Sequence, residues 1–164
     1  MKLKKNYLII VAVLLVAFVI VYFVVPGIIT GMFVKTNEIK VIGETDGFSV
    51  TDQQVCTENG KVVVYFFGHS GCSHCQWEHP ILSSVIEKFS DYVSFHDNMD
   101  SNSDSSVYSK YSEVNQGYVP FLVIGCKYVR VGSGEVAGEQ SETETLTNLI
   151  CSLTEGIPLD VCSA

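Results

Sequence analysis

Residues 61–80, KVVVYFFGHSGCSHCQWEHP, contain the most informative pattern in this chain. Residues 62–67 form a continuous run of β-branched and aromatic side chains, which is typical of a strand buried on both faces. A glycine-containing turn ends the run, and apolar residues then recur at helical spacing over residues 73–89. Cys72 and Cys75 lie where the predicted strand ends and the predicted helix begins. The stretch therefore predicts a strand–turn–helix unit that carries a C-x-x-C pair.

The remainder of the chain continues the alternation of strands and helices. A strand is expected at residues 92–97 and a weaker helix at 106–114. Two closely spaced strands are expected at 121–125 and 128–131, followed by an amphipathic helix at 142–153. Strand–helix alternation gives parallel pairing through right-handed crossovers, and the close strand pair adds an antiparallel hairpin. We expect an α/β fold with a mixed central sheet and helices on both faces, formed by residues 59–164. Residues 36–58 are expected to be a linker and N-terminal extension, with a short strand and then a short helix near residues 51–57.

The amino-terminal segment, residues 1–35, has the features of a membrane anchor. Residues 7–25 are an uninterrupted apolar run, which as a helix is about 28 Å long, close to the hydrocarbon thickness of a bilayer. The run is longer than the core of an ordinary signal peptide, and no A-x-A-like cleavage site follows it. Lys2, Lys4 and Lys5 favour a cytoplasmic amino terminus. The sequence thus predicts a single-pass protein of the cell membrane whose main domain is extracytoplasmic.

Charge is distributed unevenly along the 164 residues. Four of the 10 Lys and Arg residues precede residue 36, whereas all 18 Asp and Glu residues follow it, so the region after the anchor has a formal charge of −12. A domain this acidic repels phosphate backbones, which excludes nucleic acid as a partner.

Six cysteines, an even number, lie in the exported region. In a small extracytoplasmic domain this count predicts disulfides, although six cysteines allow 15 connectivities. The pair Cys72 and Cys75 is distinguished by its spacing. Its sulfur atoms come within bonding reach in the first turn of a helix, where unpaired backbone N–H groups and the helix dipole favour a thiolate at Cys72. His74, placed between the two cysteines, would favour that thiolate further and make the disulfide more oxidising.

Two motifs, YFFGHSGCSHCQWEHP and GYVPFLVIG, resemble the thioredoxin superfamily. The resemblance covers about residues 61–153. It implies a thioredoxin-like fold in which Pro80, five residues after Cys75, kinks the active-site helix. It also implies that Pro120 is the cis-proline facing the C-x-x-C pair, and that Val119 offers its backbone to a client strand.

The residues between the cysteines refine the resemblance. Ser73-His74 is similar to the Pro-His of DsbA-type oxidases, and so is a valine before the cis-proline. Phe66 occupies the place of a buried acid in thioredoxin, which weakens a reductase interpretation. In that fold the far end of the sheet holds both Cys56 and Cys126, so we expect the pairs Cys56–Cys126 and, by elimination, Cys151–Cys162.

The predicted function is that of a membrane-tethered thiol–disulfide oxidoreductase that donates disulfides to exported proteins, with no cofactor and no metal. Cys72 and Cys75 are its catalytic residues and His74 modulates them. The expected partners are client proteins and a membrane-integral recycling partner resembling DsbB or the vitamin K epoxide reductase family.

Alternatives stay open. One is a reductase or isomerase of the same fold, and another is a non-catalytic metal-binding module that uses Cys72, Cys75 and His79. Of the neighbouring residues, Glu78 is expected on a solvated helix face, and His96 is expected as a satisfied core histidine.

Overall fold

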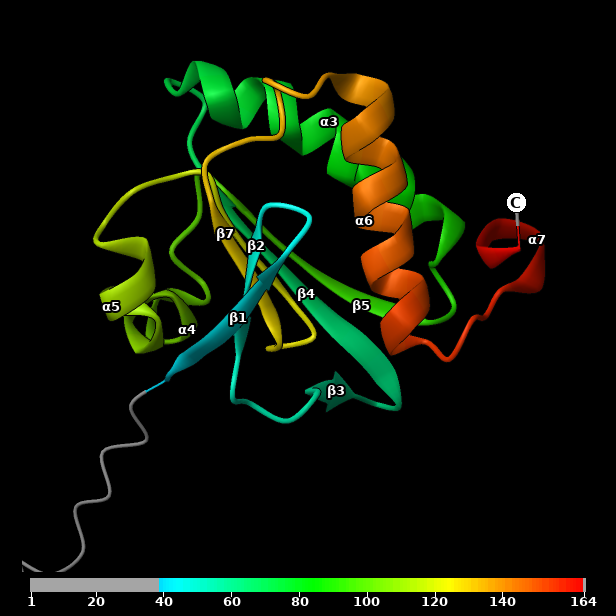
Figure 1. Cartoon of the computed structure of the whole chain (residues 1–164). Helices are drawn as coiled ribbons and strands as arrows, with labels where there is room; N and C mark the ends of the chain where they lie inside the picture. Colours follow the sequence, from blue (N-terminus) through cyan, green and yellow to red (C-terminus); the bar gives the residue numbers. More distant parts are fainter. Residues whose placement is uncertain (1–38, 164) are drawn as a thin grey trace, which may run out of the picture. The chain divides into compact units, whose positions relative to one another are not determined.

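The computed structural model describes residues 39–163. These residues fold into a mixed α/β structure around one seven-stranded sheet (Figure 1). The predicted membrane segment lies outside the described residues. Between residues 39 and 163, no helix has both the length and the apolar composition needed to cross a bilayer.

The strand formed by the apolar run is β4 (Lys61–Gly68), and it lies inside the sheet. β4 pairs in parallel with β5 (Val93–Met99) and antiparallel with β6 (Phe121–Ile124). The helix α3 (Ser73–Lys88) connects β4 to β5, and β6 turns back into β7 (Tyr128–Val131). The predicted strand–helix–strand unit and the predicted hairpin are both confirmed.

The remaining elements extend the sheet and cover it. The sheet order is β1-β2-β7-β6-β4-β3, with β5 paired to β4. The other strands and helices are β1 (Val41–Thr45), β2 (Phe48–Thr51), β3 (Thr57–Glu58), α4 (Ser105–Lys110), α5 (Ser112–Asn115), α6 (Glu139–Leu153) and α7 (Leu159–Cys162).

Side chains of the central strands alternate between two apolar cores, because successive residues of a strand point to opposite faces. Phe66 and Leu122 pack into the larger core with side chains of α3 and α6. Phe67 and Phe121 pack into the second core, against side chains of α4 and α5. Figure 1 shows α3 and α6 on one side of the sheet and α4 and α5 on the other. Helices therefore cover both faces, as the alternation of elements predicts.

In the segment expected to be a linker and extension with a short strand, residues 39–58 contribute β1, β2 and β3 to the sheet. The short helix predicted near residues 51–57 is absent, and that prediction was wrong. The reason is long-range pairing: the Thr51 N–H donates to the carbonyl of Lys127 at 2.8 Å, and the Cys56 N–H donates to the carbonyl of Gly125 at 3.0 Å. These bonds to the β6–β7 turn hold the backbone extended, so local helix propensity does not decide its conformation.

One disulfide ties the β2–β3 connection to the β6–β7 turn, and another ties α7 to α6. Cys56 pairs with Cys126 at a Cα–Cα distance of 5.5 Å, and Cys151 pairs with Cys162 at 5.6 Å. These are the pairs expected from the sequence. The first joins residues 70 positions apart, whereas the second joins residues 11 apart.

Removing the Cys56–Cys126 disulfide should lower the free energy of unfolding more than removing the Cys151–Cys162 disulfide, because it closes the longer loop. In a Cys56→Ala/Cys126→Ala variant we expect the free energy of unfolding to fall by about 2–4 kcal/mol, because the unfolded chain regains the entropy of a long open loop. Urea denaturation of the full chain, with and without the substitutions, measures this change. A loss no larger than that of a Cys151→Ala/Cys162→Ala variant would contradict the prediction.

Candidate functional site: a disulfide at the start of a helix

Cys72 directly precedes α3 and Cys75 lies in its first turn, and the structure joins them as a disulfide with a Cα–Cα distance of 5.2 Å. Cys72 is the N-cap residue of α3, with extended backbone dihedral angles. The Cys75 N–H donates to the Cys72 Sγ at 3.2 Å, and the Gln76 N–H donates to the Cys72 carbonyl at 3.0 Å. The Cys72 sulfur thus takes the place of the side-chain oxygen that usually caps a helix.

The two sulfur-bearing residues differ in exposure. Cys75 is fully buried in the larger core, whereas Cys72 is only half-buried. Close packing at the end of β4 contributes to this burial. A Cβ added at Gly68 would lie 2.7 Å from the Phe66 ring and 3.2 Å from the Cys75 Cβ, so only glycine fits there without a shift. A sulfur nucleophile from outside would reach Cys72 and not Cys75.

The loop before β6 faces the disulfide. The Val119 carbonyl oxygen lies 3.8 Å from the Cys72 Sγ, and the Val119–Pro120 peptide bond is cis, as expected for this position. Pro120 is buried, Val119 is half-buried and Tyr118 is 65% exposed. The backbone of Val119 therefore borders the Cys72 sulfur.

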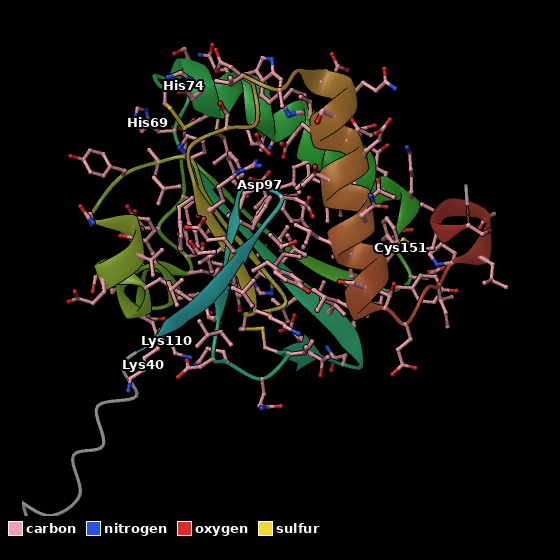
Figure 2. The ribbon with its side chains drawn as sticks, in the orientation of Figure 1. Lys40, His69, His74, Asp97, Lys110 and Cys151 are labelled. Carbon is pink, nitrogen blue, oxygen red and sulfur yellow. A yellow bond between two sulfur atoms is a disulfide. The ribbon has the colours of Figure 1, made fainter. Side chains whose placement is uncertain are left out.

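His74 lies at the start of α3 and points toward a loop that the sequence did not associate with the site. Its Nδ1 is 2.6 Å from the Glu135 Oε2, and Glu135 belongs to the connection between β7 and α6. The hydrogen bond from His74, with a second from Ser133, lowers the pKa of Glu135. Figure 2 shows His74 and His69 together at the end of the molecule where α3 begins.

Glu78 corrects one expectation from the sequence. It is fully buried and does not lie on a solvated helix face. Arg130 donates from Nη2 to the Glu78 Oε1 at 2.9 Å and to the Glu142 Oε1 at 2.6 Å, and the Gly134 N–H donates to the Glu78 Oε2 at 3.1 Å. We call Glu78, Arg130 and Glu142 the buried charge cluster. Burial, together with the charge of Glu142, raises the pKa of Glu78 to about 7, although Arg130 acts in the opposite direction.

The third residue of the metal-binding alternative, His79, is engaged elsewhere. Its Nε2 lies 2.8 Å from the Asp97 Oδ2, and its ring packs on Phe66 with 5.1 Å between ring centroids. In the part of the chain from residue 39 to residue 163, no group of three or more His, Cys, Asp or Glu residues has an arrangement that could hold a metal ion.

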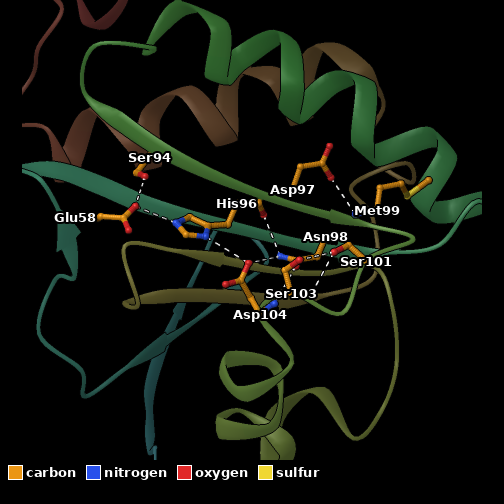
Figure 3. Close-up of polar contacts among 9 residues, drawn as sticks. All are labelled: Glu58, Ser94, His96, Asp97, Asn98, Met99, Ser101, Ser103 and Asp104. Atoms are coloured by element: carbon orange, nitrogen blue, oxygen red, sulfur yellow. Dashed lines mark hydrogen bonds and ion pairs between the residues drawn. The ribbon is translucent and has the colours of Figure 1, made fainter.

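A second polar cluster lies on β5, and the sequence did not predict it (Figure 3). The His96 ring is bracketed by Glu58, 3.1 Å from Nε2, and Asp104, 3.3 Å from Nδ1. Hydrogen bonds from Ser94 and His96 lower the pKa of Glu58. The cluster joins β3, β5 and the start of α4, which indicates a structural role for His96. His96 was expected to be a satisfied core histidine; it is hydrogen-bonded as expected, but it is half-buried.

Comparisons of the chain with protein-family models, curated proteins and solved structures find no match. A functional interpretation therefore depends on the geometry around Cys72. That geometry combines an accessible sulfur at a helix N-terminus, a buried partner sulfur and a neighbouring backbone carbonyl. In the reduced protein, the Cys75 N–H and the dipole of α3 would stabilise a thiolate at Cys72, which is the form that takes part in thiol–disulfide exchange.

Proposed function

We propose that this chain is a membrane-tethered, extracytoplasmic thiol–disulfide oxidoreductase that donates the Cys72–Cys75 disulfide to exported client proteins. The observation that carries the proposal is the asymmetry of the pair. Cys72 is half-buried and its sulfur caps α3, whereas Cys75 is fully buried. Catalytic disulfides need one sulfur open to attack and a second held ready to leave and return, while a structural disulfide needs neither.

The arrangement of elements supports a thioredoxin-like fold as part of this proposal. A parallel β4–α3–β5 unit is followed by the antiparallel β6–β7 hairpin, with the C-x-x-C pair at the start of α3 and Pro120 facing it. These features add to the sequence motifs by which the chain resembles the thioredoxin superfamily. In such a fold a client segment would lie along Val119 and pair with its backbone as an added strand.

The proposed transfer proceeds in two exchanges. A client thiolate attacks the Cys72 Sγ, the Cys72–Cys75 bond breaks, and Cys75 leaves as a thiolate that takes up a proton. A second client thiolate then attacks the client sulfur of this mixed disulfide, so the client disulfide forms and Cys72 leaves as a thiolate. The client loses two electrons and the chain gains them. A membrane-integral oxidant would then restore the Cys72–Cys75 disulfide. The proposed anchor would keep the domain close to such a partner.

The surroundings of Cys75 support donation over reduction. The residue six positions before Cys72 is the apolar Phe66, so it supplies no proton acceptor. The one buried acid on α3, Glu78, uses its two oxygens to accept from Arg130 and Gly134. His74 lies between the two cysteines in the chain, next to Cys75, and its Nδ1 is 2.6 Å from the Glu135 Oε2.

The reduction potential of the Cys72–Cys75 pair tests the proposal. It is measured on the full chain by equilibration with glutathione, together with oxidative refolding of a reduced client and reduction of insulin. We expect a potential closer to the roughly −120 mV of DsbA than to the roughly −270 mV of thioredoxin. A thioredoxin-like value with insulin reduction would favour the reductase. Retained zinc or copper, with no reversible redox transition, would favour the metal-binding module.

A further inference from the structure

A pocket of about 320 Å³ lies between the end of β4, the helix α4 and the loop before β6. Two of the residues that line this pocket also contact Cys72. The Val119 carbonyl oxygen lies 3.8 Å from the Cys72 Sγ, and the His69 carbonyl accepts from the Cys72 N–H at 3.0 Å. The pocket, which we call the α4 pocket, therefore adjoins the residue at which the proposed exchange takes place.

The lining of the α4 pocket favours an uncharged occupant. Its buried lining residues are Phe67 and Asn98, which are 6% and 1% exposed. The Asn98 Nδ2 donates to the His96 carbonyl and to the Asp104 carboxylate, and the Asn98 Oδ1 accepts from the Asp104 N–H (Figure 3). The amide is thus already hydrogen-bonded within the protein. Among the described residues that line the pocket there is no Asp, Glu, Lys or Arg, so no full opposite charge is present to compensate a buried ion.

An aromatic cluster forms one wall of the α4 pocket. Phe67 and Tyr108 both line it, and their rings meet edge to face with 5.2 Å between centroids. Phe121 stacks on Phe67 at 6.1 Å. The Tyr108 hydroxyl donates to the Tyr118 carbonyl at 3.0 Å, which fixes Tyr108 to the loop before β6. A further ring in the pocket would extend this cluster through the edge-to-face or offset contacts that aromatic pairs prefer.

The two faces of the sheet indicate which client side chain would reach the α4 pocket. Cys72 packs against the larger core, on the α3 side, whereas Phe67 belongs to the second core, on the α4 side. Val119 packs against both cores. Successive side chains of a strand point to opposite faces. A client strand that pairs with Val119 and turns its cysteine toward Cys72 would therefore turn the neighbouring side chain toward the α4 pocket.

We propose that the α4 pocket binds an aromatic side chain next to the reacting cysteine of a client, and so selects clients that carry such a pair. This inference depends on the proposed function, since it names a class of substrate for the same disulfide. The pocket volume lies at the small end of the roughly 300–1,000 Å³ that small-molecule pockets span, which suits a single large side chain. The acidity of the domain would instead favour basic clients, and the test includes that competing preference.

The test compares three reduced peptides as clients of the oxidised full chain. Each peptide carries two cysteines, and the residues flanking the first cysteine are both Phe, both Ala or both Lys. We expect the second-order rate constant for formation of the peptide disulfide to be about five- to tenfold larger for the Phe peptide than for the Ala peptide, because binding buries part of an aromatic ring. The Lys peptide should react more slowly than the Phe peptide. Alkylation of free thiols at successive times, followed by mass spectrometry, measures the rates.

Two variants of the full chain show whether this preference comes from the α4 pocket. Ser105 lines the pocket and is exposed as the first residue of α4, so Ser105→Phe fills the pocket from its rim and should abolish the preference for the Phe peptide. Ser106→Phe, the same substitution at the next exposed position of α4, lies outside the pocket lining and should keep the preference.

Four results would overturn the inference and leave the proposed function standing. These are equal rates for the three peptides, a faster reaction of the Lys peptide than of the Phe peptide, a preference that survives Ser105→Phe, and a preference that is lost equally in Ser106→Phe. A wild-type chain that oxidises none of the peptides would overturn both the inference and the proposed function.

Discussion

Substituting Cys72 by alanine should abolish disulfide donation. In the proposed reaction a client thiolate attacks the sulfur of the half-buried Cys72, because Cys75 is fully buried. We expect oxidative refolding of a reduced client to slow by about 10³-fold or more, to the rate without the protein, since losing the reacting atom of a site removes its covalent pathway. Refolding yield over time, with the full chain in catalytic amounts, measures this.

Substituting Cys75 by alanine should give a different defect. The Cys72 thiolate can then still attack the disulfide of an oxidised client, whose other sulfur leaves as a thiolate. The chain has no second sulfur to release the resulting mixed disulfide, so a covalent client adduct should accumulate on non-reducing gels. A Cys151→Ala/Cys162→Ala variant is the matched control, since it removes a disulfide that ties α7 to α6 and leaves the site intact. Unchanged activity of Cys72→Ala in both refolding and insulin reduction would rule out the enzymatic proposal.

The parts of the fold that the sequence predicted are those whose pattern is local. The apolar run at residues 62–67 lies in β4, and the residues with helical spacing after Cys72 form α3. A strand buried on both faces requires a continuous apolar run, and a helix buried on one side requires apolar residues at helical spacing, so both patterns can be read from the local sequence. Residues 51–57 left no such trace. Their conformation is set by bonds to Lys127 and Gly125, which lie some seventy positions later, and no periodicity within the segment encodes those partners.

In the candidate site, too, the residues with a local pattern could be predicted from the sequence, whereas contacts between distant residues could not. The spacing of Cys72 and Cys75 identified the disulfide, but Glu135 contacts His74 across 61 positions, and Arg130 contacts Glu78 across 52. One signal was present for the buried charge cluster. Glu78 shares the helical spacing of the buried residues Leu82 and Val85, and Glu142 shares that of Leu146 and Leu149. Two acids on core-facing stripes, in a chain with a single arginine at position 130, indicate that the arginine is their common partner.

Substituting Arg130 by methionine should therefore be the most destabilising single change outside the apolar cores. It leaves Glu78 and Glu142 buried next to each other without their cation. Breaking a buried ion pair by removal of one partner costs about 3–5 kcal/mol of unfolding free energy. Urea denaturation of the full chain, followed by the fluorescence of its one tryptophan, Trp77, measures the loss. Lys110→Met, which removes the same charge from an exposed position on α4, should change stability by less than about 0.5 kcal/mol.

The pH dependence of this loss distinguishes a charge effect from a packing effect. The pKa of Glu78 is raised from its ordinary 4.5 to about 7 in the folded protein, so the native state binds more protons than the unfolded state between these values. The contribution of Glu78 to stability therefore decreases as pH rises from 4.5 to 7. Without Arg130 the carboxyl is harder still to ionise, so Arg130→Met should lose most stability at pH 8 and least near pH 5. Adding Glu78→Gln should recover part of the loss at pH 8. An equal loss at both pH values would mean that Arg130 stabilises the fold by filling space against Phe48 and not by compensating two buried carboxylates.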